Sequence, residues 1–242
     1  MYAHYSTSLP NPAAAGWKVI CDFDGTITPF DVTDAVLAKF APPEWERIER
    51  EWLDDLISAR QCMERQVALI AAPLDALEAF LDAIPLTPGF VGFCGFCRSQ
   101  GLDLMVVSDG MDYPIKRILA AHGLGWIPVV ANRLRVFPGG GYALEFPYGR
   151  DGCPSGVCKC GVAQAGEGGT LLIGDGRSDC CLARNAEFVM ARKGKDLHRQ
   201  CVKNRYPHLV WSDFYDVRMA FSAMLNAGRR HAARPAEIRV PA

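Results

Sequence analysis

The sequence lacks any apolar run of about 18 residues, the length that a membrane-spanning helix needs. Its first residues also lack the basic region and apolar stretch of a secretory signal. An excess of charge of one sign is missing too, since 26 basic and 27 acidic residues leave a formal net charge of -1. Such a chain has no general field that would attract nucleic acid or an anionic membrane. We therefore expect a cytoplasmic protein that binds neither and that holds any anion locally.

The length of the chain sets its organisation. Its 242 residues, 50% of them hydrophobic, can bury a large core, and one domain with an insertion fits this length best. We expect a flexible tail at 1–16, a core domain built from 17–30 and 85–226, an inserted helical domain at 31–84, and a second flexible tail at 227–242. Both a monomer and a homodimer remain open.

Cysteine is common, with ten residues, but its distribution argues against a disulfide framework. Cys21 and Cys94 lie in apolar segments, where a free thiol behaves as a small buried hydrophobe. Cys153, Cys158 and Cys160 are different, because they are closely spaced in a predicted loop. They could bind a thiophilic metal such as zinc, but the paired knuckles of a typical zinc site are missing, so reduced surface thiols are the favoured interpretation.

An acidic pair follows the first predicted strand. The apolar segment 18–21 ends in Asp22 and Asp24, separated by one aromatic residue. In an extended segment these two side chains fall on one side, because side chains alternate with a period of two. Two carboxylates in one pocket repel each other, which indicates a hard cation between them, an acid-base division of roles, or both. Gly25 allows a sharp turn after the pair, and Thr26 adds a hydroxyl and an amide.

Two later apolar segments also end in polar residues. The segment 102–107 is followed by Ser108, and the segment 170–173 is followed by Asp175, with Asp179 four residues further on. In open α/β sheets, ligands bind at the carboxyl ends of the strands. The sequence therefore predicts a site at that edge of the sheet.

Residues 31–84 differ in character from the rest of the chain. Their apolar residues recur at spacings of three and four, which indicates amphipathic helices, and prolines separate them. The predicted helices span 31–40, 43–57, 59–72 and 73–84. These helices could simply be structural packing, but their position directly after the acidic pair favours a lid over the site.

The remaining chain alternates between predicted helices and strands, with a Gly-rich and aromatic hairpin at 133–147. This alternation is typical of a parallel sheet covered on both faces. The predicted fold class is therefore α/β, a doubly wound, mostly parallel Rossmannoid sheet with an inserted helical cap.

The polar strand ends resemble the motifs of the haloacid dehalogenase superfamily. Asp-Phe-Asp-Gly-Thr at 22–26 resembles the first motif, Ser108 the second, and Lys159 the third, although Lys116 and Lys193 compete for that place. The pair Asp175 and Asp179 resembles the fourth motif. The resemblance covers about residues 17–220, and it implies that the helices at 31–84 are the C1 cap of this superfamily.

This resemblance implies a phosphatase acting on a small phosphorylated metabolite. Asp22 would be the nucleophile that forms an aspartyl-phosphate, and Asp24 the general acid and base. The resemblance gives Ser108 and Lys159 contacts with the phosphoryl group, supported by Thr26 and Gly110. It also implies a Mg²⁺ cofactor held by Asp22, the backbone carbonyl of Asp24, Asp175 and, through water, Asp179. The acid at Asp24 disfavours a dehalogenase. A phosphomutase and a non-catalytic protein of the same fold are lesser alternatives.

At closer range, the segment 40–45 and the Cys-rich stretch around Lys159 resemble the methionine-salvage branch of the superfamily. That branch implies 2-hydroxy-3-keto-5-methylthiopentenyl-1-phosphate as the substrate. Phosphoserine phosphatases and phosphoethanolamine or phosphocholine phosphatases share the cap type and remain open. Asp31 is expected to contact the substrate, since the phosphoserine branch has an acidic residue there. Arg65, or Arg60 in its place, is expected to face the cleft.

Overall fold

The computed structural model describes residues 16–138, 140–163 and 169–232. Within these ranges the core is a seven-stranded sheet with the order β4-β3-β2-β1-β5-β6-β7. Its strands are β1 (Lys18–Cys21), β2 (Asp103–Met111), β3 (Val129–Val136), β4 (Tyr142–Glu145), β5 (Thr170–Gly174), β6 (Phe188–Arg192) and β7 (His208–Trp211). All neighbouring pairs are parallel except β3 and β4, which form the hairpin predicted at 133–147. The predicted α/β sheet is confirmed.

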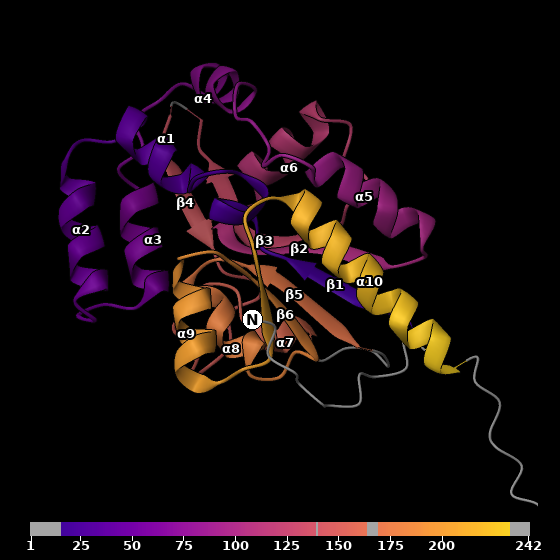
Figure 1. Ribbon diagram of the computed structural model, residues 1–242. Coiled ribbons are helices and arrows are strands. Elements are labelled where there is room, and N and C mark those ends of the chain that lie inside the picture. The colour runs from indigo at the N-terminus through magenta and orange to yellow at the C-terminus, as the bar shows by residue number, and fades with distance from the viewer. Residues whose placement is uncertain (1–15, 139, 164–168, 233–242) are drawn as a thin grey trace, which may run out of the picture.

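The first strand lies at the centre of the sheet, between β2 and β5 (Figure 1). Cys21, the last residue of β1, pairs with Val106 of β2 on one side and with Ile173 of β5 on the other. The chain order reverses direction across β1, and such a switch point opens a crevice at the carboxyl ends of the strands. The residues that follow β1, β2 and β5 therefore meet at this crevice.

Helices cover both faces of the sheet (Figure 1). One face carries α5 (Phe90–Ser99), α6 (Asp112–Ala121) and α10 (Phe214–Ala232); the other carries α7 (Lys159–Ala163), α8 (Cys180–Ala183) and α9 (Asp196–Asn204). Val19 and Cys21 of β1 pack into the first layer, whereas Ile20 packs into the second. Because both faces are buried, residues 19–21 of the strand are all apolar instead of alternating.

The inserted segment forms α1 (Val32–Phe40), α2 (Glu44–Leu53), α3 (Ala59–Val67) and α4 (Leu74–Leu81), as predicted but with shorter helices. Asp31 caps α1 by accepting a hydrogen bond from the Asp34 amide at 3.0 Å. Ser58 and Gln61 form a capping box at the start of α3. Helices α2 and α3 lie side by side beyond one end of the sheet (Figure 1).

The C-terminal end of the core differs from the prediction. Helix α10 continues to Ala232, so residues 227–232 are helical and do not belong to a tail. Apolar side chains at helical spacing hold this helix on the sheet, among them Val217, Phe221 and Leu225. The other tail residues, 1–15 and 233–242, lie outside the described ranges. No helix of the described residues is long and apolar enough to cross a membrane.

Candidate active site

The turn after β1, residues 22–28, is termed here the nucleophile turn, after the role expected of Asp22. Asp22 is buried, and its Oδ1 accepts a hydrogen bond of 2.8 Å from the Phe23 amide. Gly25 follows with a φ of 67°, a left-handed conformation that favours glycine. A Cβ at Gly25 would lie 2.4 Å from Oδ2 of Asp175. The glycine therefore lets the turn close against the end of β5.

The two acids of this turn face different partners. The ladder of β1 ends at Cys21, but Asp22 and Asp24 both line one cavity and Phe23 is buried in the core, as the predicted alternation requires. Oδ1 of Asp24 accepts from the Val32 amide at 2.8 Å, and its Oδ2 lies 3.4 Å from the Ser108 hydroxyl. Burial raises the pKa of Asp24 well above its usual range, and the nearby Asp31 carboxylate adds to this shift.

Lys159 is the first residue of α7, and its side chain contacts Asp22 of the nucleophile turn. Its side chain is fully buried, with Nζ 2.9 Å from Oδ1 of Asp22 and 2.6 Å from Oδ1 of Asp179. Burial alone would lower the pKa of Lys159, but Asp179 and Asp22 outweigh it and raise the pKa above its usual range. The two competing lysines are elsewhere: Lys116 pairs with a residue of its own helix, and Lys193 is exposed.

Asp22, Asp175 and Asp179 form a compact acidic group. One carboxylate oxygen from each lies within 4.8 Å of the others. Burial and the Asp179 carboxylate raise the pKa of Asp175 to about 6 and that of Asp22 well above its usual range, although Lys159 opposes the latter shift. Three carboxylates against one ammonium leave two surplus negative charges, and carboxylate oxygens suit a hard cation, so this group fits a divalent metal ion.

Some predicted ligands have other roles in this geometry. The carboxylate of Asp24 lies outside the acidic group, so that residue could contribute to a metal only through its backbone. Oδ2 of Asp179 accepts hydrogen bonds from the amides of Asp175 and Gly176 at 3.1 and 3.0 Å. Asp179 therefore holds Lys159 through an ion pair and the turn after β5 through hydrogen bonds. The cysteines at 153, 158 and 160 do not form a comparable metal-ligating group among the described residues.

Ser108 follows the apolar part of β2 and is buried beside Asp24. Its Oγ accepts a hydrogen bond of 3.0 Å from the Gly110 amide. A Cβ at Gly110 would lie 2.3 Å from Oδ2 of Asp24, so a side chain there would displace that carboxylate. Thr26, expected to contact substrate, is instead fully buried outside the cavity lining, and its hydroxyl donates to Oδ1 of Asp175 at 3.2 Å.

A junction that was not predicted from the sequence holds the segment leading to Lys159. Oδ1 of Asp109 accepts from the Val157 amide at 2.9 Å, and the buried Asn132 side chain donates to the Asp109 carbonyl at 2.6 Å. Gly156 fits against Asn132, where a Cβ would lie 2.5 Å from Oδ1. The available clue was a polar Asn directly after the apolar run 129–131, because buried polar groups need partners.

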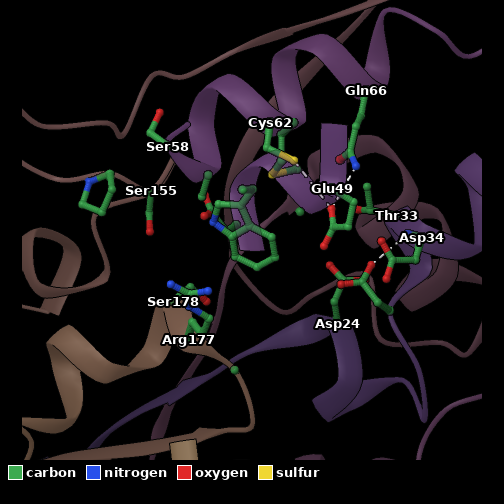
Figure 2. A pocket seen from close by; sticks show the side chains of 18 of the residues that line it. Asp24, Thr33, Asp34, Glu49, Ser58, Cys62, Gln66, Ser155, Arg177 and Ser178 are labelled. Atoms are coloured by element: carbon green, nitrogen blue, oxygen red, sulfur yellow. Dashed lines mark hydrogen bonds between the residues drawn. The ribbon is translucent and has the colours of Figure 1, made fainter. Parts of the chain in front are cut away.

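A cavity of about 750 Å³ lies between the cap and the carboxyl edge of the sheet. Its floor, defined here as Asp22, Asp24, Ser108 and Asp175, comes from the core domain. Its cap wall is defined as Asp31, Asp34 and Glu49; Figure 2 shows Asp34 and Glu49 on the same side of the pocket as Asp24. Burial in the cleft and the neighbouring cap-wall carboxylates raise the pKa of Asp34 to about 7.

The arginines expected to face the cleft do not line it. Arg65 pairs with Glu51 at 2.6 Å, and this ion pair holds the guanidinium away from the cavity. Arg60 lies over the Phe146 ring, also outside the lining. Arg177 does line the cavity, but it comes from the core. It pairs with Asp55 of the cap at 2.9 Å.

The family profile of haloacid dehalogenase-like hydrolases matches residues 19–184, which is more than half of the chain. The chain belongs to this family. It is 32% identical over 209 residues to a 2-hydroxy-3-keto-5-methylthiopentenyl-1-phosphate phosphatase from Brevibacillus brevis, covering 82% of this chain and 92% of the relative. A protein of the same name from Geobacillus kaustophilus is 30% identical, with 85% and 96% covered.

Solved structures agree with this assignment at the level of fold. A phosphoserine phosphatase with a phospho-aspartyl intermediate analogue superposes with a TM-score of 0.63 at 21% identity, covering 84% of this chain and 97% of that one. A probable phosphoserine phosphatase from Vibrio cholerae gives a TM-score of 0.69 at 17% identity, covering 92% and 68%. The predicted family and fold are thus confirmed, and the predicted class of phosphoric monoester hydrolases agrees with the names of the sequence relatives.

Proposed function

We propose that this hydrolase is a Mg²⁺-dependent phosphatase of 2-hydroxy-3-keto-5-methylthiopentenyl-1-phosphate, acting through an aspartyl-phosphate. The observation that carries the reaction is the convergence of Asp22, Asp24, Ser108 and Lys159 at one end of the sheet beneath the cap cavity. The substrate rests on relatives of that name, about 30% identical over most of both chains.

Asp22 is the nucleophile in this mechanism. The Phe23 amide and the Lys159 ammonium both bind Oδ1, which fixes the carboxylate and leaves Oδ2 to attack phosphorus. The new bond joins Oδ2 to phosphorus while the ester oxygen leaves. Lys159 and the Ser108 hydroxyl lie beside this point, where they can stabilise charge on the phosphoryl oxygens. Mg²⁺, held by Asp22, Asp175 and the Asp24 backbone, would offset the repulsion between the carboxylate and a phosphate dianion.

Asp24 serves as the acid and then as the base. Its raised pKa keeps a proton available for the leaving alkoxide, and hydrogen bonds from Val32 and Ser108 hold the carboxyl group in place. Once ionised, the same group accepts a proton from the water that attacks the aspartyl-phosphate. This second step releases inorganic phosphate and restores Asp22.

A screen of phosphorylated metabolites tests this proposal. Phosphate release with Mg²⁺ should give the highest kcat/KM for the methylthio enol phosphate among compounds that include phosphoserine, phosphoethanolamine and phosphocholine. A generic aryl phosphate serves as the control for the chemical step. Turnover of the aryl phosphate with a clear preference for another metabolite would retain the phosphatase and reject the substrate; no turnover of any ester would reject both.

The cap wall favours a second candidate substrate class, phosphoethanolamine or phosphocholine. Three carboxylates face the cavity from the cap, and their mutual repulsion contributes to the raised pKa of Asp34. A cationic head group would relieve this repulsion. Phosphoserine would also need a cation for its own carboxylate: the cap arginines lie outside the lining, and of the two cations in it, Arg177 is paired with Asp55 and Lys195 comes from the core. In the screen, this candidate predicts a preference for the two amino-alcohol phosphates.

A further inference from the structure

Hydrogen bonds to the carbonyl groups of the nucleophile turn hold its backbone in place. Thr87, on the segment that returns from the cap, donates its hydroxyl to the Thr26 carbonyl at 2.8 Å and its amide to the Ile27 carbonyl at 2.7 Å. The carbonyls of Gly25 and Thr28 have a different partner. Both accept from Nη1 of Arg192, the contact to Thr28 measuring 3.4 Å. One guanidinium thus joins two points of an irregular turn whose buried carbonyls need donors.

Arg192 is itself held in place. It is the last residue of β6, and its guanidinium lies over the Trp211 ring, 5.4 Å from the ring centroid. Trp211 is buried, and its indole nitrogen donates to the Met190 carbonyl at 3.0 Å. The contact with Trp211 therefore lets β6 and β7 orient the Arg192 guanidinium beside the turn.

The position of this turn sets the position of the catalytic groups. A Cβ at Gly25 would come within 2.4 Å of Asp175, so these two residues are in close contact. The neighbouring Thr26 hydroxyl binds the same carboxylate, and Asp24 directly precedes Gly25. A shift of the Gly25 carbonyl would therefore move the proposed acid and a proposed metal ligand together.

We propose that Arg192 is a positioning residue that locks the nucleophile turn in its reactive geometry, an inference that rests on the proposed phosphatase function. It touches neither the acidic group nor the floor of the cavity, and it acts through the carbonyls of Gly25 and Thr28. Lysine could not replace it fully, because an ammonium lacks the planar guanidinium that lies over the Trp211 ring.

Kinetics of three variants test this role. With an aryl phosphate and Mg²⁺, Arg192→Ala should lower kcat/KM by roughly 100-fold, the cost of a misplacement of about 1 Å. The loss should lie mainly in kcat, and Arg192→Lys should lie between Arg192→Ala and the wild type. Added guanidinium at millimolar concentration should restore part of the activity of Arg192→Ala, whereas ammonium at equal ionic strength should not. Arg199→Ala, which removes an exposed arginine, is the matched control and should resemble the wild type.

Hydrogen exchange gives a readout that does not need activity. The amides of Gly25 and Thr28 bind the carbonyls of Phe30 and Phe23 across the turn. Peptides covering 23–30 should exchange faster in Arg192→Ala and Arg192→Lys than in the wild type or Arg199→Ala, with unchanged exchange in β1. Arg192→Lys also tests the role if Arg192→Ala fails to fold.

Unchanged kcat and unchanged exchange in Arg192→Lys would overturn the proposal, as would a loss of activity that follows the melting temperature and is not rescued. A different result would reject the proposed function. A wild-type protein that hydrolyses no phosphate ester would reject it, while the exchange of 23–30 would still report whether Arg192 holds the turn.

Discussion

The floor and the cap wall of the cavity are both acidic, but they are built differently. On the floor, each carboxylate has a specific donor: Lys159 for Asp22, the Val32 amide for Asp24 and the Thr26 hydroxyl for Asp175. Among the described residues, the cap-wall carboxylates accept hydrogen bonds only from cap residues, Asp31 from the Asp34 amide and Glu49 from the Gln66 side chain, and they border the open cavity. Groups that are held by several elements of the core suit a chemical step that requires pre-organisation, whereas the cap groups face a ligand in the cavity. Under the proposed function, this difference assigns the reaction to the floor and the selection of substrate to the cap wall.

The largest expected effect comes from matched acid-to-amide changes in the two regions. Asp22→Asn should lower kcat by about four orders of magnitude or more, since it removes the nucleophile with little change of shape. Asp34→Asn, in the cap wall, should leave kcat for an aryl phosphate within about twofold. Steady-state phosphate release measures both. Near-native turnover by Asp22→Asn would refute covalent catalysis at this residue.

Metal removal should also act on the floor and leave the cap unaffected. Exhaustive chelation should reduce kcat roughly 1,000-fold, equivalent to about 4 kcal/mol, because the repulsion at the acidic group is no longer offset. Mg²⁺ should restore activity, and Ca²⁺ should do so poorly because its coordination is larger and more flexible. Phosphate release during metal titration measures this. Full activity in the chelated protein would reject a metal-dependent reaction.

Loss of the buried ammonium should destabilise the fold. Lys159→Met leaves Asp22 and Asp179 buried without their cation, which should reduce the free energy of unfolding by about 3 to 5 kcal/mol. Lys116→Met removes an exposed ion pair within one helix and should change the free energy of unfolding by less than about 0.5 kcal/mol. Urea unfolding in the presence of a chelator compares the two. Equal stabilities would mean that Lys159 does not hold the floor together.

A smaller change should distinguish the two candidate substrate classes. Glu49→Gln should raise KM for phosphocholine by about tenfold with little change in kcat, since it removes a charge that would contact only the cationic head group. For the methylthio enol phosphate, KM should stay within about twofold. Initial rates with both substrates give the comparison. An equal change in KM for both substrates would show that the cap wall does not distinguish substrates by their charge.

The smallest effect concerns pH. The pKa of Asp34 is raised to about 7 from an ordinary value near 4, so the folded state binds more protons than the unfolded state between these values. The contribution of Asp34 to stability is therefore present at low pH and is lost as pH rises through 7. Because Asp34 is exposed, solvent screening reduces this contribution, and Asp34→Asn should gain about 1 to 3 °C in melting temperature over the wild type between pH 5 and pH 8. A constant difference would contradict the raised pKa.

The strand pattern of the sequence predicted which polar residues lie at the ends of neighbouring parallel strands. Apolar runs located β1, β2 and β5, and the polar residues at their ends had to meet because parallel strands end at one edge. Asp22, Ser108 and Asp175 therefore lie together as the strand pattern indicated. Asp24 shares the cavity with Asp22, as the period of two predicted, but its hydrogen bonds with Val32 and Ser108 could not be predicted in this way.

Contacts between distant segments were not predictable from local pattern. Arg192 reaches the nucleophile turn from a strand whose pattern indicated only burial. Arg65 has the helical spacing of a cleft residue, yet its pairing with Glu51 turns it outward. In each case the deciding partner lies more than ten residues away. The apolar residues of 217–225 have helical spacing, which indicates the packed part of α10, and this pattern was missed.

The cap leaves and rejoins the core at almost one point. The Thr87 amide, at the end of the insertion, binds the carbonyl of Ile27, a few residues before the insertion begins. An insertion whose two ends meet adds little closure entropy to the core, whatever its internal length. The segment between them can therefore be exchanged for another as one module. For protein engineers, this junction is the place to graft a different cap and thereby a different substrate range onto an unchanged catalytic floor.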